Sequence, residues 1–368
     1  MSFDKLLENR KILVCCGSGG VGKTTVSAAI ALRAAMEGQR TLVLTIDPAK
    51  RLANSLGLTE LGNQKSRIEL PKEAKGELWG MMLDQKRTFD ELIERIAPNR
   101  ETRERILNNH YYQQVSGALA GSQEYMAMEK LWEVTQDNDF DLIVLDTPPT
   151  KHALDFLDAP RRMTEFFDGK VVQWFVKPYL AAGRMGFNFL QKGSAMIFKI
   201  LEKGTGYQTL ADLSEFFLAF DGLYEGFKDR AEAVHRMLAD SKTGFVIVTT
   251  PMHPAVDEAA YFRDRLRSSK MPLVSVLFNR VHKPLTHNEP ADTLALADEL
   301  TEQLPAYATV LDAYLELAAN LDRLAAGERK IIEKFNARAG SLALAAEIPA
   351  KTYDVHDVQS LLGVAAHF

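Results

Sequence analysis

A glycine-rich segment that ends in a lysine and two threonines is the part of the sequence that most directly indicates chemistry. It reads GSGGVGKTT over residues 17–25 and fits the pattern G-x-x-x-x-G-K-[ST]. Glycines allow backbone N–H groups to turn inward around a phosphate, and the N-terminus of a following helix adds positive charge. Lys23 would reach the β- and γ-phosphates of a nucleoside triphosphate, and the Thr24 hydroxyl would bind Mg²⁺. The predicted nucleotide-binding residues of this segment are Gly19, Gly20, Val21, Gly22, Lys23, Thr24 and Thr25.

Two aspartates at the ends of apolar runs are the predicted partners of this phosphate site. Asp47 follows TLVLTI, and Asp146 ends DLIVLD. Ligands of open α/β sheets bind at the carboxyl ends of the strands, and carboxylates suit Mg²⁺, often through its waters. We therefore predict a Mg²⁺ site formed by Thr24, Asp47 and Asp146. The alternative for either acid is a cap on the following turn.

Short apolar runs bounded by turn residues predict the strands that position these groups. Six such runs occur, at residues 11–16, 41–46, 78–83, 141–146, 244–250 and 272–279. Their nearly continuous apolarity indicates strands buried on both faces, and helical patterns such as 25–37 and 254–267 lie between them. The sequence thus predicts an α/β fold of the P-loop NTPase type, a mostly parallel sheet wrapped by helices.

The domain organisation follows from where this alternation is interrupted. Sheet segments are expected at about 1–85, 139–160 and 240–368, and helical inserts at 86–138 and 161–239. No repeat or low-complexity linker separates them. We expect one P-loop domain over residues 1–368 that carries both inserts.

Composition and charge exclude several classes of function. The net charge of −5 argues against broad nucleic-acid binding, which needs clustered Lys and Arg. The first ten residues lack the apolar core of a signal peptide, and no uncharged apolar run is long enough to cross a membrane. The only two cysteines are the neighbours Cys15 and Cys16, so neither a disulfide framework nor a zinc site is indicated. We expect a soluble cytoplasmic protein.

Four motifs, in the order GSGGVGKTT, TIDPAKRLANSL, LDTPPTKHALDFL and LFNR, resemble the arsenical pump-driving (anion-transporting) ATPases and the related tail-anchored-protein targeting ATPases. The resemblance implies ATP as substrate, Mg²⁺ as cofactor and a second ATPase subunit, identical or different, as partner. It also implies two switch segments, at 47–56 and 146–157. Pro149, Thr150 and His152 belong to the second switch. Asn279 resembles the residue that contacts adenine, and Pro349 lies in a segment similar to the loop that covers the base.

Two departures from the family pattern bear on catalysis. The family's P-loop carries a lysine that contacts the nucleotide of the partner subunit, and this sequence has Ser18 there. The family's acid near the attacking water is replaced by Asn54, whose amide can orient water but cannot accept its proton. The catalytic residues predicted here are Lys23, Asn54 and Asp47, and hydrolysis is expected to be slow.

The second insert is rich in phenylalanine and suggests a place for a client. Residues 161–231 contain 10 of the 19 phenylalanines. An apolar stripe from Leu213 to Leu238 has helical spacing and is expected to pack on a core. The segment 184–201 has apolar residues on several faces and three nearby glycines, which suits a flexible binder of apolar helices. The predicted client groove comprises Trp174, Phe187, Phe189, Leu190 and Phe198.

The leading hypothesis is an ATPase whose switches couple nucleotide state to a helical, client-binding subdomain, as in targeting or chaperone-like proteins. Its partners would be apolar helical protein segments or a membrane protein. One alternative is a nucleotide-gated scaffold with negligible turnover, which Ser18 and Asn54 favour. Another is the ATPase subunit of an arsenite or anion efflux pump. For arsenite, this alternative is weakened because the only thiols lie side by side on a buried strand.

Overall fold

A computed structural model describes residues 9–46, 51–58, 60–116, 122–147, 223–285, 308–339 and 344–368, with isolated positions at 7, 299, 303 and 306. The chain divides into two compact units, which we describe separately. The sheet unit comprises Met1–Met82, Asp139–Ala153 and Ala239–Phe368, and the helical unit comprises Leu83–Asn138 and Leu154–Leu238. The single-domain organisation expected from the sequence stays a prediction.

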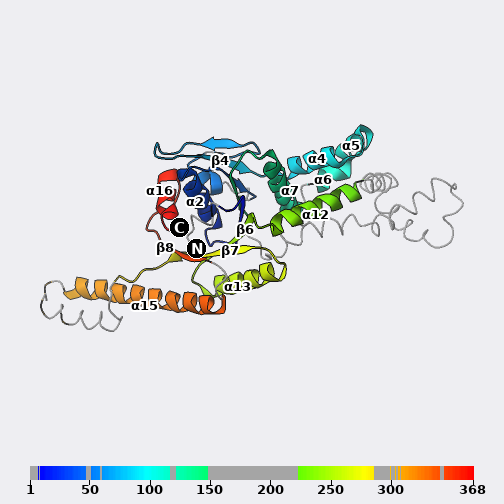
Figure 1. Cartoon of the computed structure of the whole chain (residues 1–368). Coiled ribbons are helices and arrows are strands. Elements are labelled where there is room, and N and C mark those ends of the chain that lie inside the picture. The colour runs from blue at the N-terminus through cyan, green and yellow to red at the C-terminus, as the bar shows by residue number, and fades with distance from the viewer. Residues whose placement is uncertain are drawn as a thin grey trace, which may run out of the picture. The chain divides into compact units, whose positions relative to one another are not determined.

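The sheet unit is built on one twisted sheet (Figure 1). Among the described residues, its eight strands have the order β3-β4-β2-β5-β1-β6-β7-β8, and every pair is parallel except the edge pair β3–β4. The predicted mostly parallel α/β fold is confirmed. The strands are β1 (Ile12–Cys16), β2 (Arg40–Thr45), β3 (Ser66–Ile68), β4 (Glu77–Met82), β5 (Leu142–Asp146), β6 (Thr243–Thr249), β7 (Leu273–Val281) and β8 (Leu344–Pro349).

Burial on both faces explains why the central strands could be predicted from apolar runs. All five residues of β1 and of β5 are buried, as are all seven of β6. The six predicted strands are present, with boundaries shifted by at most two residues. The strands β3 and β8 were not predicted from the sequence. At the centre, Cys15 of β1 pairs with Asp146 of β5. The ends of both strands therefore lie side by side.

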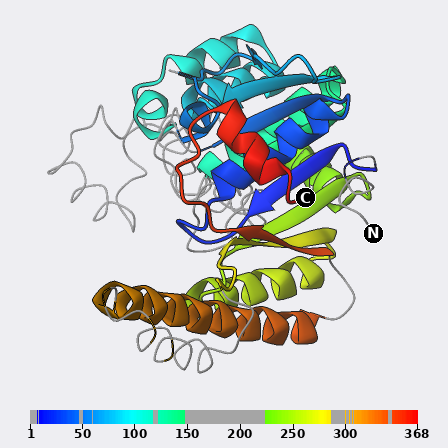
Figure 2. The same ribbon diagram turned by 90° about the vertical axis from the view of Figure 1, so that its left-hand side faces the viewer.

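Two helices pack together over one part of the sheet core, and Figure 2 shows them next to each other. They are α2 (Lys23–Met36) and α16 (Val358–Ala365). Ten residues of α2 are buried, mostly alanines and aliphatic side chains that allow close packing on the strands. A capping box between Asp357 and Ser360 starts α16, because each side chain accepts a backbone N–H of the other residue. Helix α2, whose first residue Lys23 ends the glycine-rich segment, thus packs against both the strands and α16.

Two further helices pack beside β6 and β7. They are α13 (His253–Ser268) and α15 (Ala308–Ala339). Phe335 of α15 meets Phe278 of β7 edge to face, with the ring centroids 5.5 Å apart. The buried Glu328 accepts the backbone N–H of His282 at 2.8 Å. These contacts hold α15 to the strand that carries Asn279.

The helical unit has an aromatic core. Phe89 lies between Tyr112 and Phe227, with ring centroid separations of 5.6 and 6.2 Å, and Phe227 also lies 6.4 Å from Tyr125. All four side chains are almost fully buried. The described helices of this unit are α4 (Gln85–Ile96), α5 (Arg100–Leu107), α6 (His110–Val115), α7 (Ser122–Asp137) and α12 (Tyr224–Ala239).

The described end of the predicted apolar stripe faces this core. Phe227, Val234 and Leu238 on α12 are at most 1% exposed, so the expectation of core packing is confirmed there. The rest of the second insert, and with it the predicted client groove of Trp174, Phe187, Phe189, Leu190 and Phe198, lies outside the described residues. Among the helices that the structure does describe, none has the length and apolar character of a membrane span.

Candidate nucleotide-binding site

The glycine-rich loop leaves β1 and turns sharply into α2. Gly20 and Gly22 have φ of 80° and 89°, values that favour glycine because a Cβ is strained there. At Gly22 a Cβ would also collide with the side-chain amide of Asn279. The predicted strand, glycine loop and helix are therefore all present, and two of the glycines are required by the backbone itself.

Lys23 is the buried cation of this loop. It is 6% exposed, and its Nζ donates a hydrogen bond to the backbone carbonyl of Ser18 at 2.8 Å. The ammonium group therefore crosses the loop from the first turn of α2. A cation folded back over inward-facing N–H groups forms a cradle for anionic phosphate oxygens.

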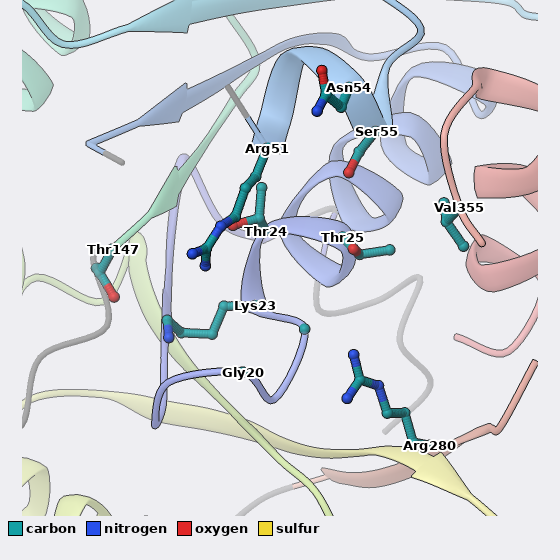
Figure 3. Close-up of a pocket in the computed structure, with 11 residues that line it drawn as sticks. Gly20, Lys23, Thr24, Thr25, Arg51, Asn54, Ser55, Thr147, Arg280 and Val355 are labelled. Atoms are coloured by element: carbon teal, nitrogen blue, oxygen red, sulfur yellow. The ribbon is translucent and has the colours of Figure 1, made fainter. Parts of the chain in front are cut away.

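A cavity of about 290 Å³ opens at this cradle (Figure 3). The P-loop and the short helix α3 (Arg51–Ser55) form most of it, together with Thr147 directly after β5, Arg280 of β7 and Val355 between β8 and α16. Lys23, Thr24 and Asn54, which the sequence predicts to act together, all line it. Its full lining is Gly20, Gly22, Lys23, Thr24, Thr25, Arg51, Asn54, Ser55, Thr147, Arg280 and Val355.

Asp146 ends β5 next to the loop. Its carboxylate is fully buried and accepts a hydrogen bond from the Thr45 hydroxyl at 2.9 Å. The next residue, Thr147, lines the cavity and donates its hydroxyl to the carbonyl of Cys15 at 2.8 Å. Thr24 lines the cavity and the Asp146 carboxylate does not. Both are hard oxygen donors of the kind that Mg²⁺ prefers, so their chemistry suits the ion, and the predicted Mg²⁺ site stays a prediction.

A second cavity of about 560 Å³ adjoins the first and shares four of its residues, Gly22, Thr25, Arg280 and Val355. Asn279 and Pro349, both predicted to lie at the nucleotide base, line it together. The Asn279 amide donates to the backbone carbonyl of Val21 at 2.8 Å, which ties β7 to the P-loop. Tyr353 and Val355 contribute to this cavity from the segment between β8 and α16.

Arg280 reaches both cavities because of an irregularity in β7. The pairing of β7 with β8 shifts register between Asn279 and Val281, and Arg280 adopts a φ of 60° that is uncommon for a side-chain-bearing residue. Its backbone N–H donates to the Asn279 side chain at 3.0 Å. Figure 3 shows the Arg280 side chain rising from the strand toward Thr25.

Both cysteines lie beneath this site in β1. They are buried, and burial raises the pKa of the Cys15 thiol to about 12 and the pKa of the Cys16 thiol well above its usual value. Soft-metal and metalloid ligation needs accessible thiolates, so this pair is poorly suited to it.

Several predicted site residues fall outside the described part of the chain. They are Asp47 at the first switch and Pro149, Thr150 and His152 at the second. Their roles stay predictions. Conversely, sequence reasoning did not single out Arg51, Arg280 or Thr147 as lining residues. Arg51 and Arg280 stand within the motifs TIDPAKRL and LFNR, so their positions beside motif residues were the available signal.

Comparison with known proteins gives a consistent result. The sequence matches the anion-transporting ATPase family over residues 10–317. ATPase ARSA1 of Chlamydomonas reinhardtii is 26% identical over 298 residues, which cover 74% of this chain but only 35% of that protein. ATPase ASNA1 homolog 1 of Paramecium tetraurelia is 26% identical over 292 residues, covering 77% of this chain and 79% of that protein. Putative arsenical pump-driving ATPase 1 of Aquifex aeolicus is 24% identical over 265 residues, covering 68% of this chain and 58% of that protein.

Glycines in left-handed conformations, a buried ammonium group and a threonine hydroxyl meet at the carboxyl edge of this parallel sheet, and the fold is that of a P-loop NTPase. Because the family match spans most of the chain, the chain belongs to the anion-transporting ATPase family.

Proposed function

We propose that this protein hydrolyses ATP and uses the change from ATP to ADP to control a helical, client-binding region. One observation carries the proposal: a single cavity is formed jointly by the P-loop, by α3 of the first switch and by Thr147, the last described residue before the second switch. A γ-phosphate in this cavity would contact all three segments, and its loss would release them together.

The path of the chain supports coupling to the helical unit. Thr147 is followed within seven residues by Leu154, where the second segment of the helical unit begins. The first segment of that unit begins at Leu83, directly after β4. A displacement of the second switch would therefore act on a short covalent connection to the helical unit.

In the proposed reaction, Lys23 neutralises charge on the β- and γ-phosphates and Asn54 orients the attacking water through its amide oxygen. Asp47 and Asp146 join Thr24 in holding Mg²⁺, partly through water. Bound Mg²⁺ would neutralise charge on the phosphate oxygens. Asn279, Pro349 and the segment around Tyr353 would enclose adenine, with Asn279 held in place by its bond to Val21.

A scaffold that binds ATP with negligible turnover is the second candidate, and the presence of Asn54 rather than an acid in the cavity favours it. Single-turnover hydrolysis of bound ATP separates the two candidates. A catalyst converts the bound ATP completely, and a scaffold retains it. The Lys23→Ala variant serves as the control in both cases, because it removes the buried cation of the cradle.

The client is proposed to be an apolar helical segment, bound by a groove at Trp174, Phe187, Phe189, Leu190 and Phe198. A suitable probe is a fluorescent leucine- and alanine-rich peptide of about 20 residues, the length of a membrane span. Its affinity should differ at least tenfold between the ATP and ADP states of the wild type. Lys23→Ala should abolish that difference. Equal peptide affinity in both states of the wild type would refute the coupling.

The related pump hypothesis predicts that arsenite stimulates turnover through cysteine. Cys15 and Cys16 are buried, and burial raises the pKa of both thiols. We therefore expect the rate of phosphate release to be unchanged by arsenite. If arsenite increased the rate of phosphate release, and this increase disappeared in a Cys15→Ser, Cys16→Ser double variant, the pump hypothesis would be supported instead.

A further inference from the structure

We propose that Arg51 is an arginine finger supplied in cis, a catalytic cation that contacts the γ-phosphate of the ATP bound by its own chain. The inference rests on the proposed hydrolysis. In that step, water oxygen forms a bond to the γ-phosphorus while the bond from this phosphorus to the β,γ-bridging oxygen breaks, and ADP leaves with the electron pair. One proton of the water goes to solvent and one remains on the phosphate product. Arg51 transfers no proton and stabilises the charge on the oxygens.

The division of residues between the two cavities places Arg51 at the γ-phosphate end. Gly22, Thr25, Arg280 and Val355 line both cavities and so mark the side of the base. Arg51 lines only the first cavity. It shares that part with the residues that hold the outer phosphates and the predicted water: Lys23, Thr24 and Asn54.

The local structure places the exposed side chain of Arg51 at the cavity. Arg51 is the first residue of α3, and Asn54 lies three residues later, so both side chains are on the same helical face. The buried side chains of Leu52 and Ala53 hold the opposite side of this short helix in the core. Figure 3 shows the guanidinium of Arg51 extending past Thr24 toward Lys23.

The charged side chains that line the cavity suit an anionic phosphate. The described lining contains Lys23, Arg51 and Arg280 and no carboxylate. In the loop itself, Lys23 is the one cation, because residue 18 is a serine whose carbonyl accepts the Lys23 hydrogen bond. A planar guanidinium can donate two N–H groups to one phosphate, which makes arginine the side chain suited to a transferring phosphoryl group.

Arg51 and Arg280 should therefore have different effects on the kinetics. Charge spreads over the γ-phosphate oxygens in the transition state, so a cation at that end binds the transition state more tightly than the substrate. A cation on the base side binds ATP, ADP and the transition state about equally. Arg51 should thus act on kcat, and Arg280 on nucleotide affinity.

The test compares Arg51→Ala, Arg51→Lys, Arg280→Ala and, as an exposed arginine outside both cavities, Arg67→Ala. Single-turnover hydrolysis should fall about 100-fold or more in Arg51→Ala and be partly restored in Arg51→Lys, while ADP affinity changes by less than about threefold. ADP with aluminium fluoride is an analogue of the transition state. In Arg51→Ala, the affinity for this analogue should fall by the same factor as the hydrolysis rate. Arg280→Ala should weaken ATP and ADP binding alike, and Arg67→Ala should match the wild type.

Mixing two inactive variants decides between cis and trans. If Arg51 acted on the partner subunit's nucleotide, a dimer of one Arg51→Ala chain and one Lys23→Ala chain would have one complete site. That site would combine the intact Lys23 of the first chain with the intact Arg51 of the second, and the mixture would regain hydrolysis. The cis role predicts a rate equal to the sum of the two separate rates. The inference would be overturned if the mixture regained activity. It would also be overturned if Arg51→Ala hydrolysed ATP at a rate within threefold of an active wild type. Either result would leave the proposed function standing. A wild-type chain that binds ATP without any single-turnover hydrolysis would overturn both.

Discussion

Asn54 lines the cavity beside Lys23 and Thr24, where we propose that it orients the attacking water, and its amide cannot accept a proton. We predict that Asn54→Asp speeds single-turnover hydrolysis by about tenfold or more, since a positioned general base contributes roughly 10²–10⁴-fold. The control is Asn99→Asp, at the N-cap of α5, where aspartate caps as well as asparagine and adds the same charge. A rate in Asn54→Asp equal to that of the control would contradict a water-orienting role.

Glu129 is a buried carboxyl group that makes the helical unit sensitive to pH. It is 0% exposed on α7, with Arg230 of α12 at 3.3 Å and Arg95 of α4 at 3.9 Å. Burial outweighs the attraction of both arginines and raises the pKa of Glu129 to about 7, from 4.5 in the unfolded chain. Between these values the folded state therefore binds more protons than the unfolded state.

The free energy of unfolding should consequently fall as pH rises from 4.5 to above 7, by an amount on the order of 3 kcal/mol. Glu129→Gln keeps the side chain neutral at every pH, so its unfolding free energy should lack this decline. The measurement is urea unfolding at pH 5 and at pH 8, followed by the fluorescence of Trp132, which packs on Arg230, in a background where Trp132 is the single tryptophan. A difference between wild type and variant that is the same at both pH values would show that Glu129 does not titrate in this window.

At the scale of elements, the bend between β1 and α2 depends on Gly22. We predict that Gly22→Ala lowers ATP affinity at least tenfold, about 1.4 kcal/mol, because its φ of 89° and the nearby Asn279 amide both reject a Cβ. Isothermal titration with ATP and Mg²⁺ measures this loss. Gly62→Ala is the matched control, since a Cβ there meets no atom within 4 Å. Equal affinities in the two variants would mean that the loop can bind ATP without its left-handed turn.

Elements were predictable where burial is uniform and less so at the sheet edges. The central strands could be located because continuous apolar runs such as ILVCC are buried on both faces. The edge strand β3 has three residues, of which only Ile68 is buried, and β8 reads LAAEIP, so neither has an apolar run of that kind. An edge strand can remain polar on its exposed side, which removes the signal.

Site residues were predictable where they belong to a motif with a known chemical role. Lys23, Thr24 and Asn54 were found through motifs, and they do line one cavity. Arg51 and Arg280 were not predicted as cavity-lining residues, because an arginine in a sequence usually indicates a solvated surface. In addition, the direction of the Arg280 side chain depends on a register shift in β7 that no local sequence pattern encodes.

At the scale of the whole molecule, the question is whether the sheet unit and the helical unit unfold together. We expect one cooperative transition, as the single-domain organisation requires, with ATP raising the unfolding free energy of both units equally, by about 2.7 kcal/mol at 100 times its Kd. Two single-tryptophan variants report separately, because Trp79 lies in the sheet unit and Trp132 in the helical unit. Their denaturant midpoints should coincide and shift together with ATP, and in the Lys23→Ala background neither should shift. If ATP moved the midpoint at Trp79 but not at Trp132, the two units would be separate domains, and nucleotide binding would have to reach the helical unit through the switch segments alone.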